Sequence, residues 1–166
     1  NFDALNIPPD HPAREMWDTF WLDSSHLLRT HTSPVQVRYM ETHTPPFQVI
    51  SPGRIFRFEA KDASHEINFY QLEGLMVDSD ISLANLKFVV SAFLEKLFLT
   101  SERKKLAFRF RPSYFPFVEP GVEIDMTCPF CSNGCSTCKK TKWIEICGAG
   151  MTHPNVLKAC GIDSEE

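Results

Sequence analysis

The sequence lacks any apolar run that approaches the roughly 20 residues needed to cross a bilayer. Its first residues, Asn1–Leu5, lack the basic and apolar regions of a signal peptide. A large charge excess is missing too, since 17 Lys and Arg stand against 21 Asp and Glu, for a net charge of −4. These absences argue against a membrane protein, a secreted protein and a protein that coats nucleic acid over its whole surface. We therefore expect a soluble, cytoplasmic protein in which a local patch makes any contact with nucleic acid.

Internal repeats and low-complexity linkers are also absent, so we treat residues 1–166 as one domain. A chain of 166 residues, 43% of them hydrophobic, can bury roughly 70% of its unfolded surface and needs no disulfide scaffold. The six cysteines are therefore unexpected, above all because four of them fall between Cys128 and Cys138.

The hydrophobic pattern predicts an α+β domain, with an antiparallel sheet flanked by helices. Residues 47–78 form two strand-like runs joined by a polar loop at 60–66, and a turn at Ser51–Gly53 interrupts the first run. Apolar residues at helical spacing predict an amphipathic helix over roughly Ser82–Phe98. The remaining predicted strands cover residues 106–111, 122–126 and 143–147.

Ser33 and Pro34 suit the start of a helix, as a cap followed by a first-turn proline. The alternation of Val35, Val37 and Tyr39 also suits a strand. We favour a short helix here.

Alternation across the predicted strand pair separates a polar face from an apolar one. Arg57 and Glu59 point one way in the first run, and Phe69, Gln71 and Glu73 share a face in the second. We expect the sheet to bury the other side, with Phe56, Phe58 and Leu72. The polar face is then either an ordinary solvated surface or a binding surface.

The amino-acid sequence of this segment resembles motif 2 of the class II aminoacyl-tRNA synthetases, in particular that of the alpha subunits of bacterial phenylalanyl-tRNA synthetases. The matching residues are Gly53–Glu59 and His65–Gly74. Further segments resemble the same family in the same order along the chain. They are Asn1–Asn6, His11–Arg14, Leu28–Ser33, Arg111–Phe117 and Gly148–Leu157. The resemblance implies the class II catalytic fold and ATP-dependent activation of L-phenylalanine to an adenylate, followed by transfer to tRNA(Phe). It also implies a beta subunit as partner in an α2β2 heterotetramer.

By position, the resemblance implies an ATP site. Arg57 would grip the α-phosphate, where a guanidinium fork suits the charge that builds up during attack. Glu59 would contact the adenine amino group or the tRNA end, and His65 would reach the outer phosphates. Phe69 would stack on the adenine.

The same resemblance implies a phenylalanine pocket. His31, Ser33, Gln71 and Glu73 would hold the ammonium and carboxylate groups of the substrate. Phe115 and Phe117 would meet its phenyl ring, although ordinary core packing could also explain these two residues. Glu119 would be a Mg²⁺ ligand completed by the beta subunit, since one carboxylate provides too few ligands for this ion.

Two Cys-x-x-Cys pairs, Cys128 with Cys131 and Cys135 with Cys138, have the spacing of a structural zinc site. The alternatives are two disulfides or free thiols. We expect zinc, in a lineage-specific insertion at 127–142 of the family domain. Zinc binding would then replace the core that so short a loop cannot build.

The family's motif 3 and most of its motif 1 have no counterpart in these 166 residues, so we expect a fragment of the catalytic domain that is inactive alone. One rival hypothesis is a noncatalytic synthetase-like module that binds amino acid or RNA. Another is a zinc-ribbon interaction protein in which the sheet is only a scaffold. A basic stretch at 103–111 could meet tRNA phosphates or be a solvated strand edge.

Overall fold

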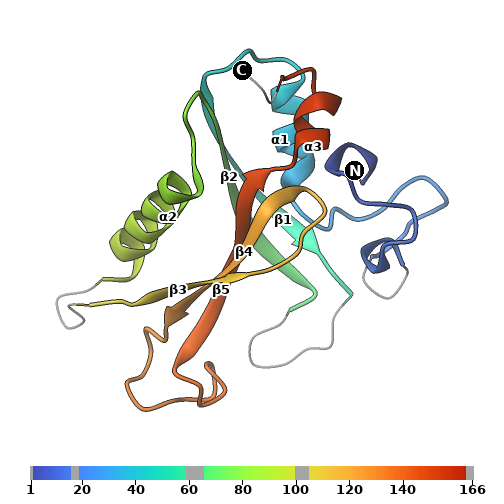
Figure 1. The fold of residues 1–166 in the computed structure, drawn as a ribbon. Coiled ribbons are helices and arrows are strands. Elements are labelled where there is room, and N and C mark those ends of the chain that lie inside the picture. Colours follow the sequence, from blue (N-terminus) through green and yellow to red (C-terminus); the bar gives the residue numbers. More distant parts are fainter. Residues whose placement is uncertain (1, 16–18, 59–65, 100–104, 164–166) are drawn as a thin grey trace. The chain divides into compact units, whose positions relative to one another are not determined.

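A computed structural model describes residues 2–15, 19–58, 66–99 and 105–163 (Figure 1). Antiparallel strand pairs accompanied by helices make it an α+β fold, as the sequence predicts.

The chain divides into two compact units. The first contains residues 1–79 and 152–166, and the second contains residues 80–151. The second unit is thus continuous in sequence, whereas the first is assembled from both ends of the chain.

An antiparallel strand pair forms the centre of the first unit. β1 (Phe47–Phe56) pairs with β2 (Asn68–Val77), and Ser51 lies opposite Glu73. Because β1 is continuous, the predicted turn at Ser51–Gly53 is wrong. Both strands of a two-stranded sheet are edges, where the missing N–H of Pro52 is tolerated.

Short helical elements surround this pair. They are η1 (Asp3–Leu5), η2 (Pro12–Arg14), α1 (Ser33–Met40) and α3 (Pro154–Ala159). The preference for a helix at Ser33 is confirmed, and Pro34 lies in its first turn. Thr32 rather than Ser33 occupies the N-cap position, so the hydroxyl of Ser33 is available for another contact.

The first unit buries apolar side chains from both ends of the chain. The buried residues are Phe2, Leu5, Ile7, Val37, Met40, Ile55, Leu75 and Val156. The side-chain amide of Asn155 also donates a hydrogen bond to Asn6 Oδ1, at 3.2 Å. These contacts hold α3 to the first residues of the chain.

The second unit contains one helix and a three-stranded sheet. Its elements are α2 (Leu83–Phe98), β3 (Phe108–Pro112), β4 (Val118–Thr127) and β5 (Trp143–Thr152). The sheet order is β3-β4-β5, and β3 and β4 pair antiparallel. The sequence places these elements correctly but makes β4 and β5 too short.

Helix α2 begins where the sequence predicts. Ser82 is its N-cap, and the Ser82 hydroxyl accepts a hydrogen bond from the backbone N–H of Asn85. The Asn85 side chain accepts one in return from the Ser82 backbone, at 2.9 Å, which completes a capping box. Across the described ranges, no helix combines the length and apolar character that a membrane span requires.

The core of the second unit lies between α2 and the sheet. Its buried members are Leu94, Leu106, Val122, Ile124 and Met126. Side chains spaced three or four residues apart on α2 pack against side chains at alternate positions of β4. This packing follows from the 3.6-residue period of a helix and the two-residue period of a strand.

Candidate functional site

In the strand pair of the first unit, the polar face is buried and the apolar face is exposed, which is the reverse of the prediction. Tyr70 is 74% exposed and Leu72 is 51% exposed, whereas Gln71 and Glu73 are half-buried. Phe58, at 55%, is exposed as well. The alternation was predicted correctly, but the direction of burial was wrong, because α1 and the segment before it pack on the polar face.

Glu73 of β2 is the centre of this covered polar face. Its Oε1 accepts a hydrogen bond from the Ser33 hydroxyl at 2.9 Å, and its Oε2 accepts one from Gln36 Nε2 at 2.7 Å. Burial raises the pKa of the Glu73 carboxyl above its ordinary value, and the bond from Ser33 partly opposes this. Ser33 and Gln36 lie one helical turn apart on α1, so the helix presents both to one carboxylate.

The role of Gln36 was missed by the sequence analysis. Its position three residues after Ser33 on a predicted helix was the signal that could have revealed it.

Gln71 holds the start of α1 in place. Its Oε1 accepts a hydrogen bond from the backbone N–H of Thr32, at 3.1 Å. The backbone of β1 approaches the same segment closely, because a Cβ atom built on Gly53 would lie 3.0 Å from Thr32 Cγ2. A side chain at position 53 would therefore displace the segment that carries His31 and Ser33.

His31 lies just before this helix start, with both ring nitrogens buried. Among the described residues, neither nitrogen has a hydrogen-bond partner. Burial, together with the positive charge of Arg57, lowers the pKa of His31 to about 4. His31 is therefore neutral at pH 7. Two buried ring nitrogens without partners indicate a place where a polar ligand could bind.

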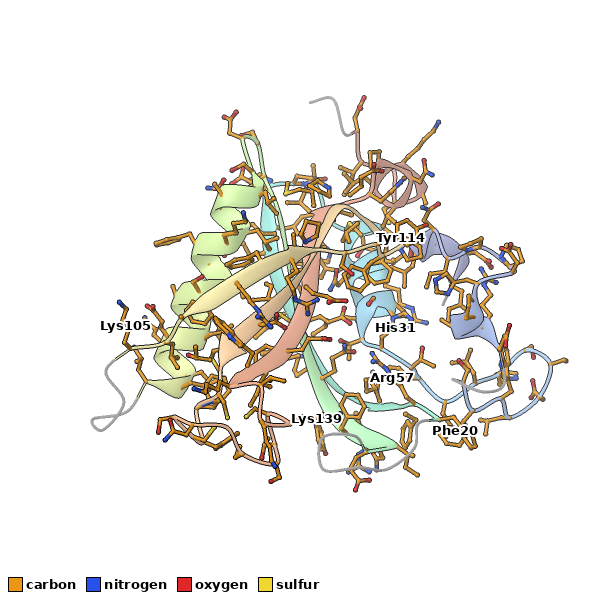
Figure 2. All side chains as sticks on the ribbon, turned by 60° about the horizontal axis from the view of Figure 1, so that its bottom comes forward. Phe20, His31, Arg57, Lys105, Tyr114 and Lys139 are labelled. Atoms are coloured by element: carbon orange, nitrogen blue, oxygen red, sulfur yellow. The ribbon has the colours of Figure 1, made fainter. Side chains whose placement is uncertain are left out.

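Arg57 follows the end of β1. Its Nε donates a hydrogen bond to the Thr30 carbonyl at 3.0 Å, and its guanidinium carbon lies 5.5 Å from the centre of the Phe69 ring. Figure 2 labels Arg57 and His31, which lie close together in that view. The structure thus brings His31, Ser33, Gln71, Glu73, Arg57 and Phe69 together in one unit, as a polar surface with an aromatic ring at its edge.

Two predicted site residues, Glu59 and His65, lie outside the described residues. Their predicted roles stay predictions.

Phe115, Phe117 and Glu119 belong to the second unit. The two rings stack with their centres 5.9 Å apart. A Cβ atom on Gly148 would lie only 2.6 Å from Phe115 Cζ, so the glycine makes room for this ring. Glu119 is exposed on β4, and no group of three or more metal-ligating side chains within the described ranges includes it.

The four cysteines form a second candidate site, in the loop between β4 and β5. All four Sγ atoms lie within 4.8 Å of one another. The Sγ atoms of Cys128 and Cys135 are 3.8 Å apart, and those of Cys131 and Cys138 are 3.6 Å apart. Zn–S bonds of about 2.3 Å place four sulfurs about 3.8 Å apart at the corners of a tetrahedron. The cluster therefore has the dimensions of a zinc site. The described residues include all six cysteines, and none of these forms a disulfide.

Backbone groups of the loop favour the thiolate form of Cys138, whereas burial raises the pKa of Cys131. The Cys135 N–H donates a hydrogen bond to Cys138 Sγ at 3.2 Å, and with the Lys142 N–H it lowers the pKa of Cys138 to about 6. Gly134 joins the two cysteine pairs at a φ of 99°, and a Cβ atom there would lie 2.9 Å from the Lys140 carbonyl oxygen. Only glycine suits this position.

Two arginines of the predicted basic stretch form ion pairs, and residues 103 and 104 of that stretch lie outside the described residues. Arg109 and Arg111 each place Nε 2.7 Å from Oδ2 of Asp125, whose side chain is 3% exposed. Arg109 also lies over the Trp143 ring, at 4.4 Å. These contacts favour a structural role for both arginines.

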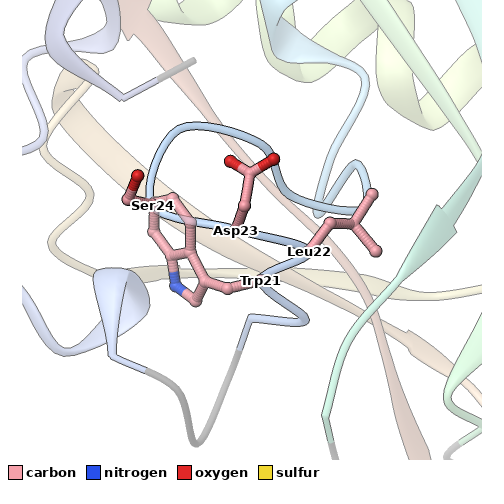
Figure 3. A pocket seen from close by; sticks show the side chains of 4 residues that line it. All are labelled: Trp21, Leu22, Asp23 and Ser24. Carbon is pink, nitrogen blue, oxygen red and sulfur yellow. The ribbon is translucent and has the colours of Figure 1, made fainter.

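A hollow on the first unit is lined by Trp21, Leu22, Asp23 and Ser24 (Figure 3). The Asp23 carboxylate accepts hydrogen bonds from the backbone N–H groups of Ser25 and His26, which close a local turn. None of the predicted site residues lines this hollow, so we do not assign it to the site.

Comparison with known proteins identifies relatives over the whole chain. Residues 1–166 match the family described as tRNA synthetases class II core domain (F). The chain is 55% identical over its full length to the phenylalanine–tRNA ligase alpha subunits of Pseudomonas savastanoi pv. phaseolicola and of Pseudomonas syringae pv. syringae. It is 54% identical to the corresponding subunit of Pseudomonas putida. The match covers 48% of each relative, so the chain spans about half the length of these proteins.

A solved structure shares the fold at much lower identity. The pyrrolysyl-tRNA synthetase PylSc of Desulfitobacterium hafniense matches with a TM-score of 0.61 and 18% identity, over 96% of this chain and 52% of that one. At this identity the match supports the fold alone.

Proposed function

The chain belongs to the family of class II tRNA synthetase core domains (F), and from this membership we propose that it is the central catalytic part of a phenylalanine–tRNA ligase alpha subunit. The proposed reaction joins L-phenylalanine to ATP as phenylalanyl-adenylate and then transfers the phenylalanyl group to tRNA(Phe). The observation that carries the proposal is the 55% identity to such subunits over the whole chain. The covered polar face around Glu73 supports it with a surface suited to a zwitterionic ligand.

In the activation step, Arg57 would bind the α-phosphate of ATP. Attack by the carboxylate of phenylalanine increases the negative charge around this phosphorus, and a guanidinium group held beforehand stabilises that charge. The bond from Arg57 Nε to the Thr30 carbonyl holds the side chain in place and leaves the two terminal nitrogens of the guanidinium group to bind phosphate. Phe69, beside the guanidinium, would stack on adenine, with Glu59 at the adenine amino group and His65 at the outer phosphates.

Phenylalanine would bind with its charged groups at the polar face. Glu73 and Gln71 can accept hydrogen bonds from the ammonium group, and the Ser33 hydroxyl, which donates its proton to Glu73, can accept one as well. His31 would supply a neutral donor and acceptor, because its lowered pKa keeps it uncharged. The family resemblance assigns the phenyl ring of the substrate to Phe115 and Phe117 of the second unit.

The whole ligase would use partners beyond this chain. When bound with ATP, Mg²⁺ would neutralise phosphate charge, and Glu119 together with the beta subunit would hold one such ion. We propose an α2β2 assembly that works in the cytoplasm, where translation takes place.

Arg57 offers a sharp test, because Arg54, three residues earlier on β1, is a matched control. Arg54 lies on the exposed face, where it donates to the Tyr70 hydroxyl at 3.2 Å. In the full-length subunit with its beta partner, Arg57→Ala should lower phenylalanine-dependent ATP–pyrophosphate exchange about 10²- to 10³-fold. Arg54→Ala should leave the exchange within about twofold. Equal effects of the two substitutions would overturn the role of Arg57.

A noncatalytic synthetase-like module is the alternative function. It predicts that the full-length protein is stabilised by a phenylalanyl-adenylate analogue in a thermal shift but supports no exchange. We expect the isolated 166-residue chain to be inactive, and measurable exchange by this chain alone would contradict that.

We also propose that the four cysteines bind one structural Zn²⁺. Their mutual distances support this proposal, since they match the edges of a zinc–thiolate tetrahedron. Four protein ligands leave no open position on the ion, which argues for stabilisation of the loop and against catalysis.

Metal analysis under reducing conditions should find about one zinc per chain. Cys131→Ser should lower the zinc content and the free energy of unfolding, because one of four ligands is lost. Cys160→Ser, outside the cluster, is the control. Zinc content well below one per chain, or equal in the two variants, would contradict the site.

A further inference from the structure

The cysteine loop, residues 128–142, carries features that zinc binding alone does not require. It contains Lys139, Lys140 and Lys142 and no acidic residue, although the whole chain has a net charge of −4. All three lysines are exposed, and Figure 2 labels Lys139 on this loop. The loop is therefore a local basic patch on an acidic protein.

The backbone beneath these lysines is unusual. Lys139, Lys140 and Lys142 have φ angles of 48°, 63° and 69°. This left-handed region is costly for residues with a Cβ atom, and glycine or asparagine occupies it more readily. Lysine at three such positions indicates that the side chains serve a purpose beyond the turn.

An exposed aromatic ring accompanies the basic patch. Phe130 lies between the first two cysteines and is 70% exposed. The ring lies in the same loop as the three lysines. A flat ring beside positive charges is the combination with which proteins bind unpaired nucleotides, since bases stack on the ring and phosphates meet the charges.

From these observations we propose that the cysteine loop binds a single-stranded segment of RNA. Phe130 stacks on a base, and Lys139, Lys140 and Lys142 contact successive phosphates. Under the proposed function, on which this inference rests for its source of RNA, the ligand is an unpaired segment of the tRNA substrate.

The lysines could instead merely offset the thiolates, since zinc with four thiolates leaves about two net negative charges. Phe130 carries no charge and separates the two explanations. Charge compensation gives the ring no role, whereas RNA binding requires it.

The test measures binding of a fluorescein-labelled single-stranded RNA of mixed sequence to the zinc-loaded full-length protein by fluorescence anisotropy. The triple variant K139N/K140N/K142N removes the charges while placing asparagine at left-handed positions. It should weaken binding about tenfold or more and lower the salt slope of log K by about 2, at about 0.7 per phosphate contact. The control K87Q/K96Q/K158Q removes three exposed lysines elsewhere and should change binding less than about twofold.

Phe130→Ala should weaken RNA binding about five- to tenfold with zinc content unchanged. Two results would overturn the proposal. One is equal binding by the triple variant and its control. The other is full RNA binding by Phe130→Ala. Loss of assembly with the beta subunit in the same variant would then identify the ring as a protein contact, and intact assembly would leave charge compensation as the role of the lysines.

The assay contains neither ATP nor phenylalanine, while the exchange assay for Arg57 contains no RNA. Failure of this inference is therefore distinguishable from failure of the proposed function.

Discussion

The Ser33 hydroxyl donates a hydrogen bond of 2.9 Å to the Glu73 carboxylate, across 40 residues of sequence. This bond joins the first turn of α1 to the middle of β2. It helps to cover the polar face of the strand pair. Burial of this face raises the pKa of the Glu73 carboxyl above its ordinary value, and the bond from Ser33 partly opposes that rise.

Glu73 should make stability depend on pH. Between its ordinary pKa of 4.5 and its raised value in the folded protein, the folded state holds a proton that the unfolded chain has released. The free energy of unfolding should therefore decrease as pH rises through this range. In Glu73→Gln this decrease should be missing from urea unfolding curves measured between pH 4 and 7. The exposed Glu95→Gln is the control, and a parent-like slope in Glu73→Gln would contradict the assignment.

His31 should act in the opposite direction. The unfolded chain binds a proton at the ordinary pKa of 6.5, and the folded protein only near pH 4. The stability that neutral His31 provides is therefore present above pH 6.5 and lost as pH falls toward 4, by up to about 3 kcal/mol. NMR titration of the imidazole checks this. The folded protein should titrate near 4 and the denatured protein near 6.5, and titration near 6.5 in both would refute the prediction.

Gly148 should control the position of the Phe115 ring. In Gly148→Ala the new methyl group meets Phe115 Cζ at 2.6 Å, so the ring must shift. We expect a loss of about 1–3 kcal/mol in the free energy of unfolding. If this ring contacts the substrate as proposed, the KM for phenylalanine should rise as well.

Gly74→Ala is the matched control for this substitution, because no atom lies within 4 Å of a Cβ at Gly74. It should be neutral or slightly stabilising. Equal destabilisation by both substitutions would mean that the contact with Phe115 is not the cause.

Asp125 should stabilise the second unit through its two arginines. The guanidinium groups of Arg111 and Arg109 lower the pKa of its carboxyl below the ordinary 3.8, so this stabilisation is lost as pH falls below that value. Asp125→Asn should cost about 1–3 kcal/mol, because the arginines are half-exposed and water partly replaces the lost charge. Urea unfolding measures this. Asp80→Asn, at an exposed position with a φ of 60°, should cost almost nothing, and equal costs would contradict the prediction.

The parts of the fold that follow from local patterns were predictable from the sequence. Ser82 and the spacing after it specify α2, because the cap and the apolar stripe both lie within one segment. The strands were found by alternation, and the two cysteine pairs show their spacing directly. The family resemblance is confirmed by the relatives.

The parts that depend on distant packing were not predictable. Alternation separates Gln71 from Leu72 but cannot say which face α1 will cover. Pro52 suggested a turn because its neighbours in sequence give no sign that β1 is an edge strand. Gln36 was missed because its partner, Glu73, lies on an element 37 residues away.

The first unit takes its residues from both ends of the chain, and α3 packs on the first turn through Asn155 and Asn6. A ribosome delivers residues 80–151 before it delivers α3, and domains generally fold as units during synthesis. The second unit can therefore fold while the chain is still being made. The first unit can close only after α3 has emerged, and therefore later than residues 80–151.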